Sequence, residues 1–162
     1  MHISSSMIDV AQVSGGDFDP NDGKFSNFPE ITDKTVEVLK AKGITSLFPI
    51  QTHCFYPMYQ REDLIARDLT GSGKTFAFAL PIVEYMRKNK LFKTGHVQAI
   101  MIAPTRELAL QITAQINNLK HSADEFKVVT VYGGVSVSDQ AYQLKRGVDL
   151  FVGTTGRVLD HI

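Results

Sequence analysis

Residues 63–75 read Asp63-Leu-Ile-Ala-Arg-Asp-Leu-Thr-Gly-Ser-Gly-Lys-Thr75, an order that is typical of a strand, a glycine loop and the start of a helix. The apolar run Leu64–Ala66 predicts the strand, and the apolar run Phe76–Met86 predicts the helix. Gly71 and Gly73 allow backbone N–H groups to turn inward on phosphate oxygens, and the helix N-terminus adds free donors and a positive dipole end. The stretch therefore predicts a phosphate-binding loop.

Polar side chains complete this predicted site. Lys74 would reach the β- and γ-phosphates of a nucleotide, and the Thr75 hydroxyl would ligate Mg²⁺. We assign the catalytic role to these two residues and nucleotide binding to the whole run Thr70, Gly71, Ser72, Gly73, Lys74 and Thr75. The alternative is a plain glycine turn between a strand and a helix, which the Gly-Lys-Thr ending in this context disfavours.

Asp68 is the unusual residue of the loop. It stands five positions before Gly73, where the usual pattern of such loops has a glycine. A carboxylate beside a polyphosphate is repulsive unless another group neutralises it. Two outcomes stay open: the side chain points away, or it weakens nucleotide binding.

Composition restricts the class of protein. The 162 residues are enough for one domain with a buried core, and their formal net charge of zero does not indicate a strongly basic nucleic-acid binder. The single cysteine, Cys54, excludes an internal disulfide framework, fits a reducing compartment and is interpreted as buried filler. No apolar run reaches the length that spans a membrane, and no secretory signal is visible.

The chain before the phosphate loop is predicted to hold an arm and two helices. Residues 1–24 carry few large apolar side chains, so we expect a disordered or loosely attached arm. Thr32 is a suitable N-cap for a helix that Gly43 ends, and a second helix begins at Pro49. After the loop, Arg87, Lys88, Lys90 and Lys93 form a basic cluster that we interpret as a solvated connection.

Strands and helices then alternate. The predicted strands are 97–103, 127–132 and 148–152, the predicted helices follow residue 107 and cover 137–145, and residues 153–157 are predicted as a loop. Alternation of this kind indicates an α/β domain with a parallel sheet flanked by helices. Ligands bind beyond the carboxyl ends of such strands. We therefore expect the loops at 68–75, 104–107, 133–134 and 153–157 to share one edge.

Five segments of the chain resemble the motifs of the DEAD-box family of ATP-dependent RNA helicases. In chain order they are similar to the Q motif (Gly43–Gln51), motif I (Asp68–Thr75), motif Ia (Pro104–Gln111), the GG motif (Gly133-Gly134) and motif Ib (Gly153–Arg157). The resemblance implies that residues 25–162 are the amino-terminal portion of the first RecA-like P-loop domain of an enzyme that uses ATP and Mg²⁺ and acts on RNA. Phe25–Pro29 and Leu47–Gln51 lean towards the nucleolar RNA helicase II/Gu subgroup, which implies a nuclear or nucleolar location, although related organellar helicases share the second pattern.

The resemblance also implies an adenine site. The Gln51 amide both donates and accepts, which matches the N6/N7 edge of adenine, and Phe25 would stack on the base. Phe28 competes with Phe25 for this role. The alternative for Gln51 is an exposed helix glutamine.

RNA contacts are implied for six residues of the later motifs: Thr105, Arg106, Gly133, Gly134, Thr154 and Arg157. Hydroxyls, guanidinium groups and exposed backbone contact phosphate and ribose without selecting a base sequence. The alternatives are a helix cap at Thr105, a surface charge at Arg106 and a plain turn at the two glycines. Thr155 replaces the proline of motif Ib, which frees the local backbone.

The family's Asp-Glu-Ala-Asp motif does not occur in the sequence. We therefore expect this chain alone to bind nucleotide weakly and to hydrolyse it hardly at all, and we expect an apolar strand edge that leaves it marginally stable or drives self-association. Two other functions stay open: a non-catalytic nucleotide- or RNA-binding module, and another kind of P-loop NTPase.

Overall fold

The structure is a computed structural model that describes residues 8–10, 18–123 and 125–162. The chain folds into two compact units, Met1–Tyr85 and Met86–Ile162, hereafter unit 1 and unit 2. The boundary falls inside helix α3 (Lys74–Lys88). In the described part of the chain, no helix is both long and apolar enough to cross a membrane.

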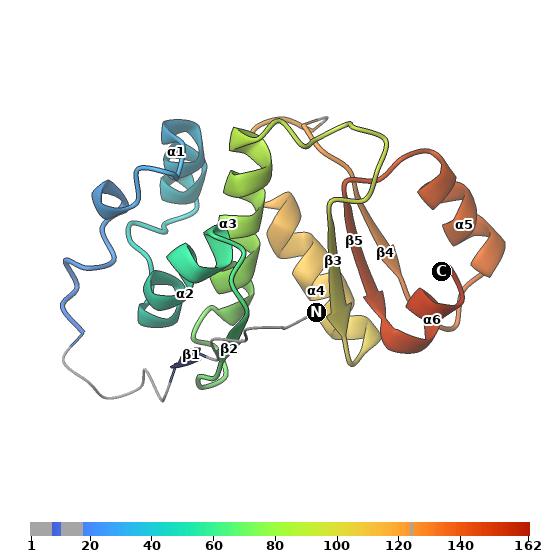
Figure 1. Ribbon diagram of the computed structural model, residues 1–162, viewed down its shortest axis with the longest axis horizontal. Helices are drawn as coiled ribbons and strands as arrows, with labels where there is room; N and C mark the ends of the chain where they lie inside the picture. The colour runs from blue at the N-terminus through green and yellow to red at the C-terminus, as the bar shows by residue number, and fades with distance from the viewer. Residues whose placement is uncertain (1–7, 11–17, 124) are drawn as a thin grey trace, which may run out of the picture. The chain divides into compact units, whose positions relative to one another are not determined.

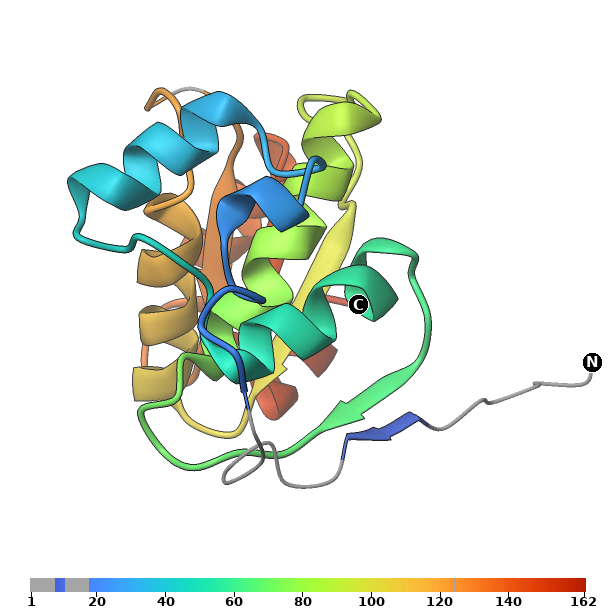
Figure 2. The same ribbon diagram turned by 90° about the vertical axis from the view of Figure 1, so that its left-hand side faces the viewer.

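Unit 1 is built from helices around the first part of α3 (Figure 2). Its other elements are β1 (Ile8–Val10), η1 (Phe25–Asn27), α1 (Asp33–Ala41), α2 (Pro49–Tyr59) and β2 (Leu64–Ala66). One part of its core joins Ile50, Cys54 and Ala77, so the interpretation of Cys54 as buried filler is confirmed. A second part is aromatic, with the rings of Phe28 and Phe55 packed edge to face at 5.0 Å.

A buried carboxylate fixes the start of α1. Glu84 of α3 is fully buried and accepts hydrogen bonds from the Thr32 N–H, at 3.2 Å, and from the Thr35 hydroxyl. Thr32 is the N-cap residue, as predicted, and Gly43 follows the helix with a φ of +80°. The carboxylate satisfies an N-terminal donor that the helix itself leaves unpaired, which also offsets the cost of burying the charge.

The predicted arm, residues 1–24, lies largely outside the described residues. Its described parts are β1, which pairs with β2 in a two-stranded parallel sheet, and residues 18–24. Gly23 is close to Leu47: its carbonyl accepts the Leu47 N–H at 2.8 Å, and a Cβ on Gly23 would lie 2.2 Å from the Leu47 carbonyl oxygen. The end of the segment is therefore held against the residues that precede α2.

Unit 2 is a three-stranded parallel sheet between helices (Figure 1). Its elements are β3 (Ala99–Ala103), α4 (Arg106–Asn117), β4 (Val128–Val131), α5 (Val137–Lys145), β5 (Leu150–Thr154) and α6 (Thr155–Leu159). The strand order is β3-β5-β4, with Ala103 opposite Thr154 and Val131 opposite Gly153. The predicted parallel sheet flanked by helices is confirmed.

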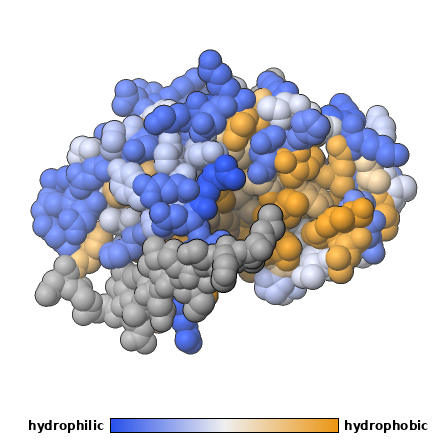
Figure 3. Space-filling view, viewed as in Figure 1, coloured by the Kyte–Doolittle hydropathy of each residue, from blue (hydrophilic) through white to orange (hydrophobic). Residues whose placement is uncertain are grey.

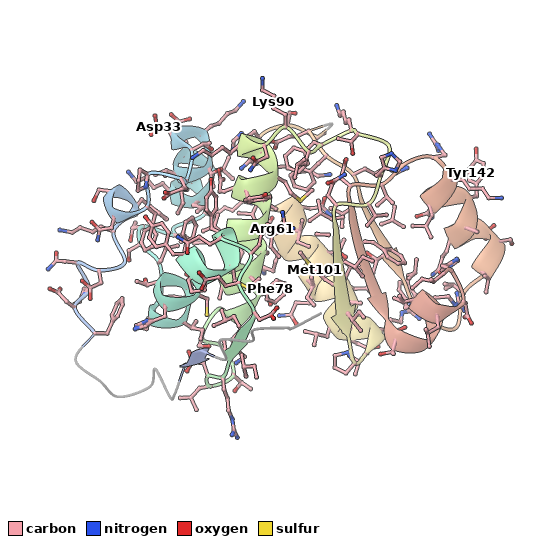
Figure 4. The ribbon with its side chains drawn as sticks, viewed as in Figure 1. Asp33, Arg61, Phe78, Lys90, Met101 and Tyr142 are labelled. Carbon is pink, nitrogen blue, oxygen red and sulfur yellow. The ribbon has the colours of Figure 1, made fainter. Side chains whose placement is uncertain are left out.

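Helices cover both faces of this sheet. On one face, α4 contacts all three strands, and its Thr113 hydroxyl bonds the Thr130 hydroxyl at 2.6 Å. On the other face, Val129, Val131 and Phe151 form a core with residues of α5 and α6. Met101 of β3, labelled in Figure 4, is buried.

The predicted loop at 153–157 is wrong. Gly153 and Thr154 are the last residues of β5, and α6 begins at Thr155. A Cβ on Gly153 would lie 2.6 Å from Val158 Cγ2 and 2.7 Å from Val131 Cγ2. The glycine therefore allows close packing inside a strand, whereas the sequence suggested a flexible turn. The predicted strands at 97–103 and 127–132 exist, but the first begins two residues later and ends as predicted, and the second is one residue shorter at each end.

Candidate functional site

The phosphate loop of unit 1 has the expected backbone. It follows β2, both Gly71 and Gly73 have a φ of +84°, and α3 begins at Lys74. The Lys74 ammonium donates to the carbonyl oxygens of Asp68, at 2.9 Å, and Leu69. These neutral acceptors belong to the phosphate loop itself, so the Lys74 side chain points back toward its own loop. An anion would be a stronger partner for it than either carbonyl.

Ser72 shows that the loop has unused hydrogen-bonding capacity. Its Oγ is buried and, in the described part of the chain, has no hydrogen-bond partner. Buried hydroxyls are nearly always bonded in folded proteins, and an unsatisfied one is a place where a ligand or water fits. Thr75, half-buried in the first turn of α3, and the exposed Thr70 add two more hydroxyls to the same stretch of chain. The donor set of the loop therefore fits a polyphosphate with a bound cation.

Gln51 joins α2 to the phosphate loop. Its side chain is 7% exposed; Oε1 accepts the Phe48 N–H at 2.9 Å, and Nε2 donates to the Gly73 carbonyl oxygen at 3.1 Å. A Cβ on Gly73 would lie 2.3 Å from that nitrogen, so only glycine allows the approach. The alternative of an exposed helix glutamine is wrong. Three residues after the N-cap, a glutamine is a known capping signal, but the bond to Gly73 has no local signal in the sequence.

Asp68 is bonded within the loop. Its Oδ1 accepts the N–H of Leu69 at 2.8 Å. Burial, and to a smaller extent the negative charge of Asp68, raise the pKa of the Cys54 thiol. Cys54 is therefore a protonated, unreactive thiol at neutral pH.

The two candidate adenine-stacking rings differ in burial. Phe28 is 3% exposed and packs on the rings of Phe55 and Tyr56. Phe25 begins η1 and is half-buried. Phe28 thus belongs to the core, and Phe25 is the less buried of the two rings.

The implied RNA residues meet at the carboxyl edge of the sheet in unit 2. We name Thr105, Arg106, Gly133, Gly134, Thr154 and Arg157 the strand-end surface. They follow or end β3, β4 and β5, whose arrows point to one edge in Figure 1. Thr105 caps α4, with Oγ1 accepting the Leu108 N–H at 3.3 Å. The guanidinium of Arg106 lies 4.5 Å from the ring centre of Tyr132, a residue that the motif comparison did not select.

Arg157 holds this surface in place through three hydrogen bonds. Its Nη1 donates to the Val135 carbonyl oxygen at 2.9 Å and to Gln140 Oε1 at 2.8 Å, and its Nε donates to Asp160 at 3.1 Å. Gln140 in turn donates to the Tyr132 carbonyl oxygen at 3.2 Å. The chain from Tyr132 to Val135 is therefore held at both ends around Gly134, whose φ is +86°. Nothing in the sequence marked Gln140 as part of this network.

The described residues contain no group of three or more His, Cys, Asp or Glu side chains able to hold a metal ion.

Comparison with known proteins shows the family of the chain. Residues 48–162 match the model of the DEAD/DEAH box helicase family. The chain is 41% identical over 143 residues to ATP-dependent RNA helicase DDX50 of Homo sapiens, covering 87% of the chain and 19% of that protein. It is also 41% identical to nucleolar RNA helicase 2 of Rattus norvegicus, covering 87% and 18%. The chloroplastic DEAD-box ATP-dependent RNA helicase 3B of Zea mays is 43% identical, with 82% and 18% covered.

A solved structure agrees with these relatives. The DEAD box protein from the hyperthermophile Methanococcus jannaschii matches with a TM-score of 0.72 and 32% identity, over 83% of this chain and 36% of that one. The chain spans about a fifth of the length of the curated relatives it matches. With the glycine loop, the Gln51 contact and the strand-end motifs in place, the chain belongs to the DEAD/DEAH box helicase family.

Proposed function

We propose that this chain forms the nucleotide-binding and RNA-binding part of an ATP-dependent RNA helicase. In this proposal unit 1 binds ATP and the strand-end surface of unit 2 binds the RNA backbone. The observation that carries it is the state of Lys74, whose ammonium rests on two carbonyl oxygens of its own loop beside the unbonded Ser72 hydroxyl. These groups change partners without rebuilding the fold when phosphates enter.

The phosphate loop would hold a nucleotide with its own donors. Lys74 transfers its ammonium from the Asp68 and Leu69 carbonyls to the β- and γ-phosphates, and Ser72 gains its missing partner. Thr75 would ligate Mg²⁺, which when bound neutralises the charge on the phosphate oxygens. The N-terminus of α3 adds backbone donors and a positive dipole end at the same place.

Gln51 retains enough capacity to select adenine. A glutamine amide has two N–H donors and an oxygen with two lone pairs. The bonds to Phe48 and Gly73 use one donor and one lone pair, so one of each is left for the N6/N7 edge. Guanine presents acceptors at both positions, which would leave the remaining lone pair of the amide oxygen without a donor.

The strand-end surface would contact RNA through phosphate and ribose. Gly133 and Gly134 are exposed, and a Cβ on either would meet nothing within 4 Å, so a phosphate can approach their backbone closely. Arg106 is exposed and supplies the charge. Contacts of this kind do not select a base sequence. We propose Arg157 as a residue that positions the loop, because three internal acceptors already occupy it.

Titrations with ATP and GTP test the adenine assignment, in the unchanged chain and in Gln51→Ala. We expect the variant to lose about tenfold in ATP affinity and much less in GTP affinity, so the preference for ATP disappears. Thr52→Ala is the matched control, because it removes a different bond to Phe48, at 3.2 Å, and leaves the amide in place. Equal binding of ATP and GTP by the unchanged chain would refute the assignment. An equal loss of affinity for both nucleotides in Gln51→Ala would show that Gln51 stabilises the loop and does not select the base.

We also propose a nuclear or nucleolar location, by similarity to the nucleolar relatives. A fluorescent fusion tests it, and exclusion from the nucleus would contradict it.

We also propose that two copies of the chain associate through β3. In the described part of the chain β3 pairs with β5 along one edge only, and its Ile100 and Ile102 are 53% and 59% exposed. Figure 3 shows hydrophobic surface in the β3 and α6 part of unit 2. An open apolar strand edge is a template for pairing with a second copy of the chain. We expect light scattering to detect dimers that Ile102→Lys abolishes; a stable monomer at high concentration would contradict this.

A further inference from the structure

A cavity of about 520 Å³ lies at the amino-terminal edge of the sheet in unit 2. The segments that enter the three strands line it: Lys93 and Gly95 before β3, Lys127 at the start of β4, and Asp149 at the start of β5. The strand-end surface lies at the opposite edge. A strand of five residues separates the two edges by about 15 Å, so the cavity is distinct from the proposed RNA contacts.

Four cationic side chains line this cavity, which we name the basic cavity. They are Lys93, Lys120, Lys127 and Arg146, and they come from three connections of the chain: the one before β3, the one between α4 and β4, and the one after α5. Among the described lining residues, Asp149 is the one carboxylate, so the lining carries an excess of positive charge. Like charges gathered in one concave site repel one another and raise the local concentration of anions.

Asp149 holds the wall of the basic cavity together. It is 3% exposed, and its oxygens accept the backbone N–H groups of Lys93, at 2.5 Å, and Lys127, at 2.8 Å. The Lys93 backbone has a φ of +58°, a conformation that L-residues rarely adopt without support. A buried carboxylate therefore fixes the two segments that carry two of the cations. The basic cluster of residues 87–93, which the sequence predicted as a solvated connection, does not act as one group. Lys93 lines this cavity, whereas Arg87 forms an ion pair with Glu125 at 2.7 Å.

The Lys127 ammonium keeps donors available for a ligand. The Lys127 ammonium donates to the Gln143 carbonyl oxygen at 3.2 Å, which uses one of its three N–H groups. The Lys120 ammonium lies 5.1 Å from the ring centre of Phe126, which also lines the cavity. Gly95 and Gly147 have open space where a Cβ would be, so backbone there is accessible.

We propose that the basic cavity binds a small phosphate-bearing ligand, such as a polyphosphate chain or the phosphates of a free nucleotide. Its volume is within the range of small-molecule sites, and lysine and arginine donors match phosphate oxygens. The phosphate backbone of RNA has the same chemistry and is the second source to distinguish. The proposal does not depend on the nucleotide site of unit 1.

Amide chemical shifts under titration with tripolyphosphate, at constant ionic strength, test the proposal. We expect saturable shifts at Gly95, Lys127 and Gly147, separate from those at Gly71 and Gly73 of the phosphate loop. In the double variant Lys127→Gln, Arg146→Gln, the tripolyphosphate affinity measured from the cavity amides should fall at least tenfold. The shifts of the phosphate-loop amides should stay unchanged. Lys88→Gln, Lys145→Gln removes the same charge from exposed positions that do not line the cavity, and it is the control.

Lys93→Gln, at an exposed side chain, repeats the test should the double variant unfold. Absence of saturable shifts at the cavity, or an equal loss of affinity in the control, would overturn the proposal. Single-stranded RNA identifies the source: if it displaces tripolyphosphate from Gly95 and Gly147, the cavity takes an RNA backbone. If RNA shifts the amides of Gly133 and Gly134 and leaves the bound tripolyphosphate in place, the ligand is a free phosphate compound.

Discussion

The phosphate loop of unit 1 and the strand-end surface of unit 2 satisfy their polar side chains in different ways. In unit 1, Lys74 and Gln51 bond to backbone atoms of the same site that a nucleotide would occupy. In unit 2, Arg157 bonds to the neighbouring Val135 carbonyl oxygen, and the backbone of Gly133 and Gly134 is exposed. In the proposed function, the first site would exchange hydrogen-bond partners when it binds nucleotide, whereas the second would bind RNA with its internal hydrogen bonds already formed. Substitutions in unit 1 should therefore change mainly ATP affinity, and substitutions in unit 2 should change mainly stability and RNA affinity.

Lys74→Ala should have the largest effect on binding. The variant removes the cation that would contact the β- and γ-phosphates, so ATP affinity should fall by about 10- to 100-fold, or about 1.5–3 kcal/mol. RNA affinity should not change. Lys88→Ala, at the other end of α3, is the control. Calorimetry measures both affinities, and unaltered ATP binding by Lys74→Ala would remove the basis of the proposed nucleotide site.

Gly153→Ala tests how firmly the strand-end surface is preformed. The new methyl group would meet Val158 and Val131 at less than 3 Å, so unfolding should become easier by about 1–3 kcal/mol. Gly156→Ala, in α6, meets nothing within 4 Å and should be neutral or stabilise by about 0.5–1 kcal/mol. Urea denaturation compares the two variants. Equal stabilities would show that the packing around Gly153 does not constrain the end of β5.

Arg157→Gln distinguishes positioning from direct contact. We expect RNA affinity to fall by about fivefold, which is about 1 kcal/mol, with ATP affinity unchanged. The logarithm of the RNA-binding constant falls linearly with the logarithm of the salt concentration. Loss of a direct phosphate contact makes this slope smaller by about one, whereas loss of a positioning residue leaves the slope unchanged. We expect the slope to stay the same for Arg157→Gln and to fall for Arg106→Gln. The reverse pattern would exchange their roles.

The pH dependence of stability should show the smallest effect. Burial alone would raise the pKa of Glu125, but the hydrogen bonds from Arg87 and the His121 N–H, with the charges of both residues, lower it below its usual range. A carboxylate whose pKa is lowered by folding stabilises the protein above the pKa of the unfolded chain, about 4.3, and loses that contribution as pH falls through the folded value. Stability should thus fall between pH 5 and pH 3.

Glu125→Gln should reduce this acid-induced loss by no more than about 1 kcal/mol, because the pair is partly exposed to solvent. Denaturation of both forms at pH 7 and pH 3.5 measures the difference. A larger loss in Glu125→Gln than in the unchanged chain would contradict the direction of the pKa shift.

Sequence alone predicted the parts of the fold that local patterns specify. Alternating apolar runs located β3, β4 and β5, and the Gly-Lys-Thr ending located the start of α3. Residues 153–157 were predicted wrongly because Gly153 and Thr154 have the composition of a turn, and only packing against Val131 and Val158 explains the strand. Local propensity is weak where tertiary contacts oppose it.

The candidate sites divide in the same way. Lys74, Ser72 and Gln51 were selected from motifs, and the structure places Gln51 and Lys74 at one loop. The bond between Gln51 and Gly73 joins residues 22 positions apart, and the brace from Arg157 to Gln140 joins residues 17 apart. The cations of the basic cavity likewise come from three separate connections of the chain. Spacing along the chain does not predict contacts of this kind, because they depend on the register of the sheet and on how the helices pack.

Site-resolved amide shifts on adding ATP with Mg²⁺, and then single-stranded RNA, test the assignment of two ligands to two units most directly. ATP should shift the amides of Gly71, Gly73 and Lys74 in unit 1, and RNA should shift those of Gly133, Gly134 and Thr154 in unit 2. Shifts of one shared set of amides by both ligands, or no shift at the strand-end surface with RNA, would contradict the assignment.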